Sequence, residues 1–145
     1  MRNLTLRQAN SADAKRLFEL RNHPQIREQS HNSNIIDFDE HQAWIDKVVL
    51  DESKAICIVE DDNDNFIGMV RFELIDHMYL MSWVVSPKFQ GHGFGKKMVK
   101  MASQEMNHGP LRAEIKKNNA ASVKIAEYIG MRLIKEIEGT LFYQK

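Results

Sequence analysis

The sequence predicts an α/β fold, in which one central mixed sheet of about seven strands is flanked by about four helices. Three observations predict it. Seven segments are β-rich or alternate apolar with polar residues, four others carry the apolar periodicity of an amphipathic helix, and the two kinds are interspersed along the chain. Its 145 residues, 43% hydrophobic and 28% charged, are typical of one soluble globular domain. We therefore expect a single domain over residues 1–145.

The first part of the chain predicts a strand and two helices. Residues 3–8 alternate apolar with polar side chains and indicate an opening strand. Ser11 is the expected cap of a helix over 11–22, which ends before a proline because the residue preceding proline avoids the helical region. Asp37 is the expected cap of the second helix, which runs to about Val49.

The middle of the chain predicts three consecutive strands. Segments 55–60 and 66–74 are β-rich and flank the turn-forming residues 61–65, so they should form a hairpin. Segment 78–85 continues as a third strand.

The last third alternates helices and strands. A helix is expected over 93–107, a strand over 111–115, and a helix over 120–129 that ends at a glycine. Segments 132–137 and 140–144 close the chain as two strands.

The zero net charge conceals an uneven distribution. Residues 1–85 carry nine basic and fifteen acidic side chains, whereas residues 86–124 carry eight basic and two acidic ones. The basic block is either solvated surface or a site for a multiply charged anion. Because there is no overall basic excess, a general nucleic-acid binder is disfavoured.

The numbers and spacing of the cysteine and histidine residues argue against an internal disulfide and a metal site. The single cysteine, Cys57, cannot form an internal disulfide, which fits a cytoplasmic protein, and it is expected in a buried strand. The six histidines lack the spacing of metal ligands, so no metal site is expected. No apolar run has the length of a membrane span, and no membrane partner is expected.

A glycine-rich turn between a strand and a helix is the most informative segment. Three glycines alternate in Gln90-Gly91-His92-Gly93-Phe94-Gly95-Lys96. Glycines allow backbone N–H groups to converge on an anion, and the following helix N-terminus adds further donors. Two familiar phosphate loops are excluded by spacing, since Lys97 stands where a Walker A loop needs Ser or Thr, and Lys96 where a dinucleotide fingerprint needs glycine.

The remaining pattern, Q-x-x-G-x-G at Gln90, Gly93 and Gly95, resembles the acetyl-CoA signature of the GNAT family of N-acetyltransferases. A second segment, Asn119 to Met131, is similar to the N-x-x-[SA] helix of the same family. The resemblance covers essentially the whole chain. It implies a mixed, mostly antiparallel sheet and acetyl-CoA as cosubstrate, bound between two splayed strands.

The resemblance also implies which residues bind the cofactor. The acetyl carbonyl would bond the backbone near Val84 and Val85, the turn would hold the pyrophosphate, and Asn119 would hold the pantetheine arm. The cofactor-binding residues expected on this basis are Val84, Val85, Gln90, Gly91, His92, Gly93, Phe94, Gly95, Lys96 and Asn119.

Two residues are candidates for catalysis, because amine acetylation needs a base for the ammonium and benefits from an acid for the thiolate. Glu114 occupies the position of a proposed base in the similar ribosomal-protein acetyltransferases, with Glu73 as the alternative; Glu114 could also be only a polar strand residue. The family's usual acid is a tyrosine, where this chain has Ala126. Ser122 is therefore the candidate acid, although a first-turn serine can simply bond the helix backbone.

The acceptor is suggested by the segments R-N-H-P-x-I at 21–26 and I-D-F-x-E-H-x-x-W at 36–44. They resemble the acetyltransferases that modify a UDP-linked 4-amino-sugar in pseudaminic acid synthesis. The implied substrate-binding residues are Arg21, Asn22, His41 and Trp44, although helix packing and capping would also account for them.

Other acceptors stay open. The N-x-x-S helix is shared with ribosomal-protein acetyltransferases, and the acidic first half would suit a basic peptide or a polyamine. A third alternative is a sensor that binds acetyl-CoA without catalysis. The expected partner is a small-molecule amine, and a homodimer is compatible with the size of the chain.

Overall fold

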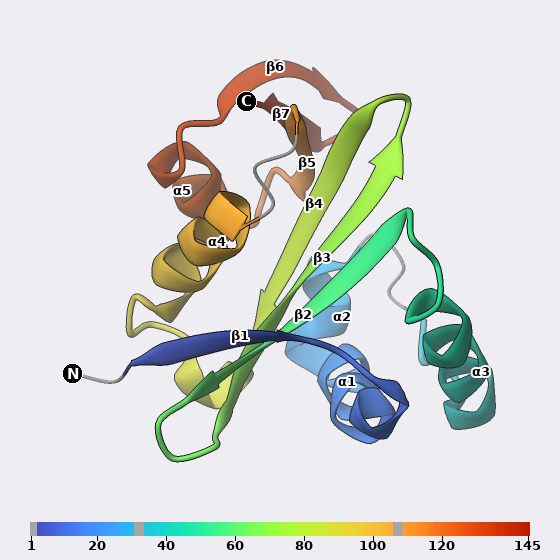
Figure 1. Ribbon diagram of the computed structural model, residues 1–145. Coiled ribbons are helices and arrows are strands. Elements are labelled where there is room, and N and C mark those ends of the chain that lie inside the picture. The colour runs from blue at the N-terminus through green and yellow to red at the C-terminus, as the bar shows by residue number, and fades with distance from the viewer. Residues whose placement is uncertain (1–2, 31–33, 106–108) are drawn as a thin grey trace.

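Seven strands form one mixed sheet in the spatial order β1-β2-β3-β4-β5-β7-β6 (Figure 1). The computed structural model describes residues 3–30, 34–105 and 109–145. The strands are β1 (Leu4–Gln8), β2 (Lys54–Asp61), β3 (Phe66–Ile75), β4 (Met78–Val85), β5 (Leu111–Lys116), β6 (Arg132–Ile137) and β7 (Thr140–Gln144). The sequence-based prediction of seven strands in one mixed sheet is confirmed.

Helices cover both faces of the sheet (Figure 1). Within the described residues they are α1 (Ala14–Asn22), α2 (Pro24–Gln29), α3 (Phe38–Val48), α4 (Phe94–Glu105) and α5 (Ala120–Tyr128), with short 3-10 turns at η1 (Ser11–Asp13) and η2 (Pro87–Phe89). Two apolar cores result. One joins Phe72 and Met81 of the sheet to Met98 of α4 and Ala126 of α5. The other packs Ile58 and Met69 against Leu17 of α1 and Ile45 of α3.

Among the strands that the structure describes, a single neighbouring pair is parallel, and it separates after two residue pairs. β4 pairs with β5 at Tyr79–Leu111 and Leu80–Arg112, whereas all other neighbouring strands are antiparallel. Beyond these pairs β4 continues along β3, and β5 continues along β7. The carboxyl-terminal halves of β4 and β5 therefore diverge, as the resemblance implied.

The helical region before β2 differs from the expectation in two details. Asn10, not Ser11, is the first cap: its side chain accepts from the Ala12 N–H, and the Asp13 carboxylate accepts from the Asn10 N–H. Pro24 begins an additional helix, α2, since its fixed φ suits a first helical turn and the His23 side chain accepts from the Gln25 N–H.

The other helix cap is as expected, because Asp37 accepts hydrogen bonds from the Asp39 and Glu40 N–H groups at the start of α3. None of the described helices is long and apolar enough to cross a membrane.

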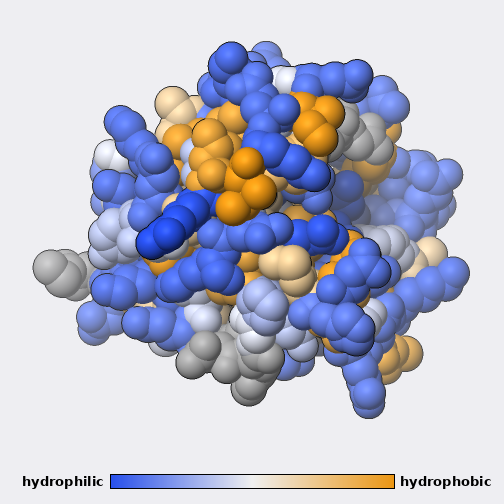
Figure 2. Space-filling model, turned by 90° about the horizontal axis from the view of Figure 1, so that it is seen from above, coloured by the Kyte–Doolittle hydropathy of each residue, from blue (hydrophilic) through white to orange (hydrophobic). Residues whose placement is uncertain are grey.

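The outer strand β6 is exposed along its whole length. Leu133, Ile134 and Ile137 have exposed fractions of 53%, 54% and 49%. Figure 2, which looks down on the top of the molecule in Figure 1, where β6 lies, shows hydrophobic side chains gathered among hydrophilic ones. This edge is the apolar surface most open to a partner among the described strands.

Gly68 allows β3 and β4 to approach each other under α4. A Cβ at this position would lie 2.3 Å from the Val84 backbone oxygen and 2.9 Å from the Met98 sulfur. Because a backbone atom cannot move aside cheaply, we expect Gly68→Ala to lower the free energy of unfolding by about 1–3 kcal/mol. Urea denaturation followed by circular dichroism measures this effect. An unchanged midpoint would contradict the close approach of the two strands.

Candidate active site

A crevice is expected where β4 and β5 diverge. Ligands of open α/β sheets bind outside the carboxyl ends of the parallel strands, at the point where the strand order changes. Here β4 leads through η2 and the glycine-rich turn into α4, and β5 leads into α5. The N-termini of both helices thus follow the diverging strand ends. Each helix N-terminus adds a partial positive charge and first-turn N–H groups that have no partner within the helical backbone.

The glycine-rich turn presents its backbone openly. Gly91 and Gly93 have φ values of +80° and +79°, and no atom lies within 4 Å of a Cβ built on either residue. Other residue types are strained in this conformation, whereas glycine adopts it readily. The first turn of α4 follows directly, so its N–H donors lie next to the turn. This arrangement fits a phosphate or pyrophosphate group.

Gly95 has a different role, since it is buried where α4 packs against β4 and α5. A Cβ here would lie 2.6 Å from the Ile125 Cδ1 and 3.3 Å from the Val85 Cγ2. The third glycine therefore permits close packing that brings the turn next to the end of β4.

The side chain of Gln90 braces the turn. Its Nε2 donates to the Val85 carbonyl oxygen over 3.0 Å, and its Oε1 accepts from the Gln25 side chain of α2. His92 is exposed, with its ring centroid 6.2 Å from that of Phe94. Lys96 places its Nζ 5.5 Å from the centroid of the exposed Tyr128 ring.

The backbone of β4 offers donors to the opening at alternate residues. The Tyr79 N–H donates to the Pro110 carbonyl on the β5 side. Because strand backbone groups alternate, the N–H groups of Trp83 and Val85 face the same side. Of the two valines expected at the acetyl carbonyl, Val85 directs its N–H towards the opening and Val84 directs its N–H towards β3.

Ser122 and Trp83 lie across the opening from one another. The Trp83 Nε1 of β4 donates to the Ser122 Oγ of α5 over 3.2 Å. Asn119 caps the same helix, with its Oδ1 accepting from the Ser122 N–H over 3.2 Å. The hydroxyl accepts the indole N–H and keeps its own proton to donate.

Ala126 occupies the position at which the family usually has a tyrosine, and it belongs to the apolar core. Ala126 is fully buried, and Tyr128 is 52% exposed with the Nζ atoms of Lys96 and Lys100 over its ring. Tyr128 therefore lies at the surface, away from the buried position that Ala126 occupies.

Glu114 lies on the face of β5 opposite α4 and α5. Its neighbours Ala113 and Ile115 belong to the core beneath those helices, and side chains alternate along a strand. Glu114 and Phe142 are among the residues that line a concavity of about 140 Å³. The alternative base, Glu73, is ion-paired: its carboxylate lies 3.4 Å from Arg71 and 3.9 Å from Lys54.

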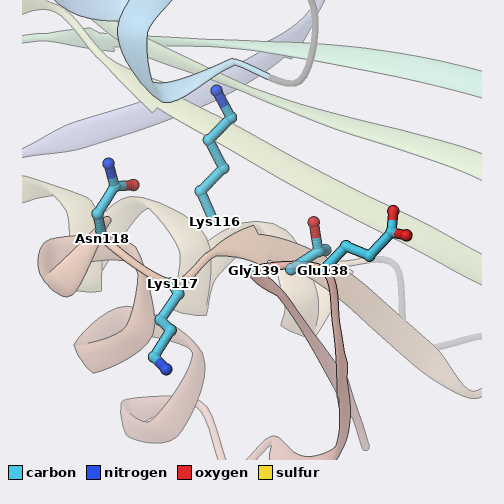
Figure 3. A pocket seen from close by; sticks show the side chains of 6 residues that line it. Lys116, Lys117, Asn118, Glu138 and Gly139 are labelled. Carbon is cyan, nitrogen blue, oxygen red and sulfur yellow. The ribbon is translucent and has the colours of Figure 1, made fainter.

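A larger concavity of about 410 Å³ lies at the carboxyl end of β5 (Figure 3). In Figure 3 the Lys116 side chain points towards α2, and its Nζ donates to the Glu28 carbonyl oxygen over 3.2 Å. Lys117 points the other way, and its Nζ lies 3.4 Å from the Glu136 carboxylate. Lys116 and Lys117, two members of the basic block, therefore point to different parts of the surface.

The candidate acceptor residues divide into two groups. Arg21 and Trp44 lie together, with the Arg21 Cζ 5.3 Å from the centroid of the Trp44 ring system. Asn22 has a structural role, because its side-chain amide both donates to and accepts from the Ile36 backbone. His41 is buried without a hydrogen bond to either ring nitrogen, and burial, with the nearby Arg21 charge, lowers its pKa.

Sequence reasoning missed two residues of this region. Arg71 looks like a solvent-facing residue of an alternating strand, and its contact with Trp44 joins segments 27 positions apart. Trp83 looks like a core residue, and its bond to Ser122 spans 39 positions.

Cys57 is buried as predicted, and burial raises the pKa of its thiol to about 11.

Comparisons with known proteins agree with this geometry. Residues 3–132 match the family model described as acetyltransferase (GNAT) domain. Acetyltransferase PseH of Campylobacter jejuni is 28% identical over 119 residues, which are 80% of this chain and 74% of that protein. Spermidine N(1)-acetyltransferase of Vibrio cholerae is 29% identical over 104 residues; the match covers 68% of this chain and only 59% of that protein.

The fold has close counterparts among solved structures. Spermidine N-acetyltransferase from Vibrio cholerae, solved in complex with CoA and spermine, superposes with a TM-score of 0.84 at 20% identity, covering 97% of this chain and 92% of that one. The family model covers most of the chain, and the sheet, the diverging strands and the glycine-rich turn agree with it. The chain therefore belongs to the GNAT family of acetyltransferases, and it is an N-acetyltransferase that uses acetyl-CoA.

Proposed function

We propose that this protein transfers an acetyl group to the 4-amino group of a UDP-linked amino-deoxy-sugar. One observation carries the choice of acceptor: the two segments that resemble amino-sugar acetyltransferases form one structural unit. Asn22, in the first segment, is hydrogen-bonded to the backbone of Ile36, which begins the second. Arg21 and Trp44, from the two segments, are in contact beside the sheet. The similarity to PseH extends over 80% of the chain.

Acetyl-CoA supplies the activated acyl group in this reaction. The glycine-rich turn and the N-terminus of α4 bind its pyrophosphate, because the surroundings of Gly91 and Gly93 are open and the helix N-terminus carries a partial positive charge. Asn119 and the N-terminus of α5 lie on the other side of the opening, where we place the pantetheine arm. The Val85 N–H donates to the acetyl carbonyl oxygen and stabilises the negative charge that develops there.

The catalytic proposal assigns one proton transfer to each of two side chains. Glu114 takes the proton of the ammonium, so that the neutral nitrogen forms a bond to the acetyl carbon. The carbon–sulfur bond then breaks, and Ser122 passes its proton to the departing thiolate. The acetylated nitrogen loses its second proton to restore the Ser122 hydroxyl, which leaves a neutral amide and CoA thiol. The Trp83 indole holds the Ser122 oxygen in place. Because a thiolate is a good leaving group, we expect Ser122 to contribute less than Glu114.

The other acceptors named from the sequence remain candidates with different support. The Vibrio cholerae relative acts on spermidine, which favours a polyamine. The acidic first half of the chain favoured a basic peptide as well, but acidic groups near β1 are bonded to arginines, as in the Arg7–Asp13 and Arg16–Glu60 pairs. A cytoplasmic location and a homodimer stay predictions, and the exposed edge of β6 is the surface we would assign to a dimer.

Release of CoA thiol from acetyl-CoA tests the acceptor. A UDP-4-amino-4,6-dideoxy-sugar, spermidine, a lysine-rich peptide and an aminoglycoside are each offered at the same concentration. We expect the amino-sugar to give a kcat/KM at least 100-fold above that of any other acceptor. Preference for spermidine or for the peptide would overturn the choice of acceptor, and the absence of CoA release with every acceptor offered would favour the sensor alternative.

A further inference from the structure

We propose that Arg21 and Arg71, which both lie against the Trp44 side chain, form a subsite that binds an anionic phosphoryl group of the acceptor. This inference rests on the proposed function, because it assigns part of the acceptor site. It goes further in predicting that the acceptor is an anion held by a pair of guanidinium groups, one of which, Arg71, belongs to a central strand.

Three elements of the fold build the subsite. Arg21 comes from the last turn of α1, Trp44 from α3 and Arg71 from β3. The Cζ atoms of Arg21 and Arg71 lie 5.3 Å and 5.0 Å from the Trp44 ring centroid. The sum of these distances, about 10 Å, is the largest separation that the two Cζ atoms can have. Both guanidinium groups therefore lie within reach of one polyphosphate.

The two arginines are poorly neutralised by the protein. Among the residues that the structure describes, Arg21 forms no ion pair. Arg71 has one long contact, 3.4 Å to Glu73, and Glu73 also lies 3.9 Å from Lys54. Burial and the charge of Arg71 lower the pKa of Arg21. Two like charges held near one aromatic ring favour an anion that hydrogen-bonds to both.

The buried histidine next to this pair adds no compensating negative charge. His41 packs against Trp44, with ring centroids 5.8 Å apart, and its lowered pKa favours the neutral imidazole near neutral pH. The ring nitrogens of His41 have no hydrogen-bond partner in the described structure. The aromatic wall of the subsite is therefore neutral, and the two arginines determine its charge.

The subsite lies beside the opening of the sheet. Arg71 pairs across the strands with the exposed Ser82 of β4, and Ser82 follows the last β4–β5 pair at Leu80. Met69, two residues before Arg71 on the same side of β3, belongs to the core under α1 and α3. An acceptor held by Arg71 therefore approaches β4 from the face that carries α1 and α3. A polycation would be repelled at this position.

Titration calorimetry with UDP as the probe tests the subsite. The protein is first saturated with CoA, so that the pyrophosphate site at the glycine-rich turn is filled. Arg71→Met and Arg21→Gln remove one charge each, and Arg132→Met on the exposed strand β6 is the matched control. We expect UDP to bind the wild-type protein, with its Kd raised at least tenfold by either Arg71→Met or Arg21→Gln and less than twofold by Arg132→Met. Acetyl-CoA affinity and the circular dichroism spectrum should be unchanged in all three variants.

The outcomes separate this inference from the proposed function. Binding of UDP with equal affinity by wild type, Arg71→Met and Arg21→Gln would overturn the subsite, as would no binding of UDP or of inorganic pyrophosphate to the wild type. Arginine-dependent binding of pyrophosphate or UDP, without turnover of any UDP-amino-sugar, would support the anion subsite and overturn the proposed acceptor. Turnover of the amino-sugar with the same KM in all variants would leave the function standing and overturn the subsite.

Discussion

Gly93→Glu is expected to abolish the binding of acetyl-CoA, with a Kd raised at least 100-fold. The substitution places a carboxylate in the open space above the turn, next to the N–H groups that we assign to the pyrophosphate. It also forces a non-glycine residue to a φ of +79°, which costs about 1–2 kcal/mol of stability. Isothermal titration calorimetry measures the loss of affinity directly.

Gly139→Glu is the matched control for that experiment. Gly139 has a φ of +82° and equally open surroundings, but it lies in the turn between β6 and β7. The two variants should therefore lose similar stability while only Gly93→Glu loses acetyl-CoA. Equal retention of the cofactor by both variants would show that the glycine-rich turn does not bind pyrophosphate.

Glu114→Gln is expected to lower kcat/KM by about 10²–10⁴ at neutral pH, which is the usual contribution of a general base. An alkyl ammonium has a pKa near 10, so few amine acceptors are neutral at pH 7 without a base. As the pH rises, more of the acceptor loses its proton in solution, and the deficit of the variant should shrink. Steady-state kinetics between pH 6.5 and 9.5 measure this profile, with an acceptor identified by CoA release.

Glu73→Gln is the control for the base, because it removes the same charge from the alternative candidate. Glu73 is ion-paired with Arg71 and Lys54, and these contacts occupy its carboxylate. We expect its kcat/KM to change less than tenfold and its pH profile to keep the wild-type shape. A pH profile unaltered by Glu114→Gln, or altered only by Glu73→Gln, would remove Glu114 from the mechanism.

The sequence predicts those parts of the fold and the site that depend on local pattern. The bounds of β4, β6 and β7 agree with the structure, and turn-forming residues follow β4 and separate β6 from β7. The glycine-rich turn was found from residue spacing alone, and its two left-handed glycines have the expected conformation. The cap Asp37 was found for the same reason, since a capping residue acts within its own first turn.

The parts that could not be predicted depend on contacts between distant segments. The bond from Trp83 to Ser122 and the contact of Arg71 with Trp44 arise only when the sheet has formed. Asn22 and His41 match a substrate-binding motif by residue type. In the structure, however, the Asn22 side-chain amide is hydrogen-bonded to the Ile36 backbone, and the His41 imidazole is buried. Residue type therefore indicated the region that we propose for the acceptor, whereas the contacts show which of its side chains have structural partners.

A crystal structure of the protein with acetyl-CoA tests the central claim most directly. The claim is that the cofactor enters the opening between β4 and β5 from the glycine-rich turn. We predict that the pyrophosphate lies on the N–H groups of residues 91–95, with the acetyl carbonyl on the Val85 N–H and the sulfur near Ser122. A cofactor bound outside the opening, or with its acetyl group remote from both Val85 and Glu114, would contradict the account.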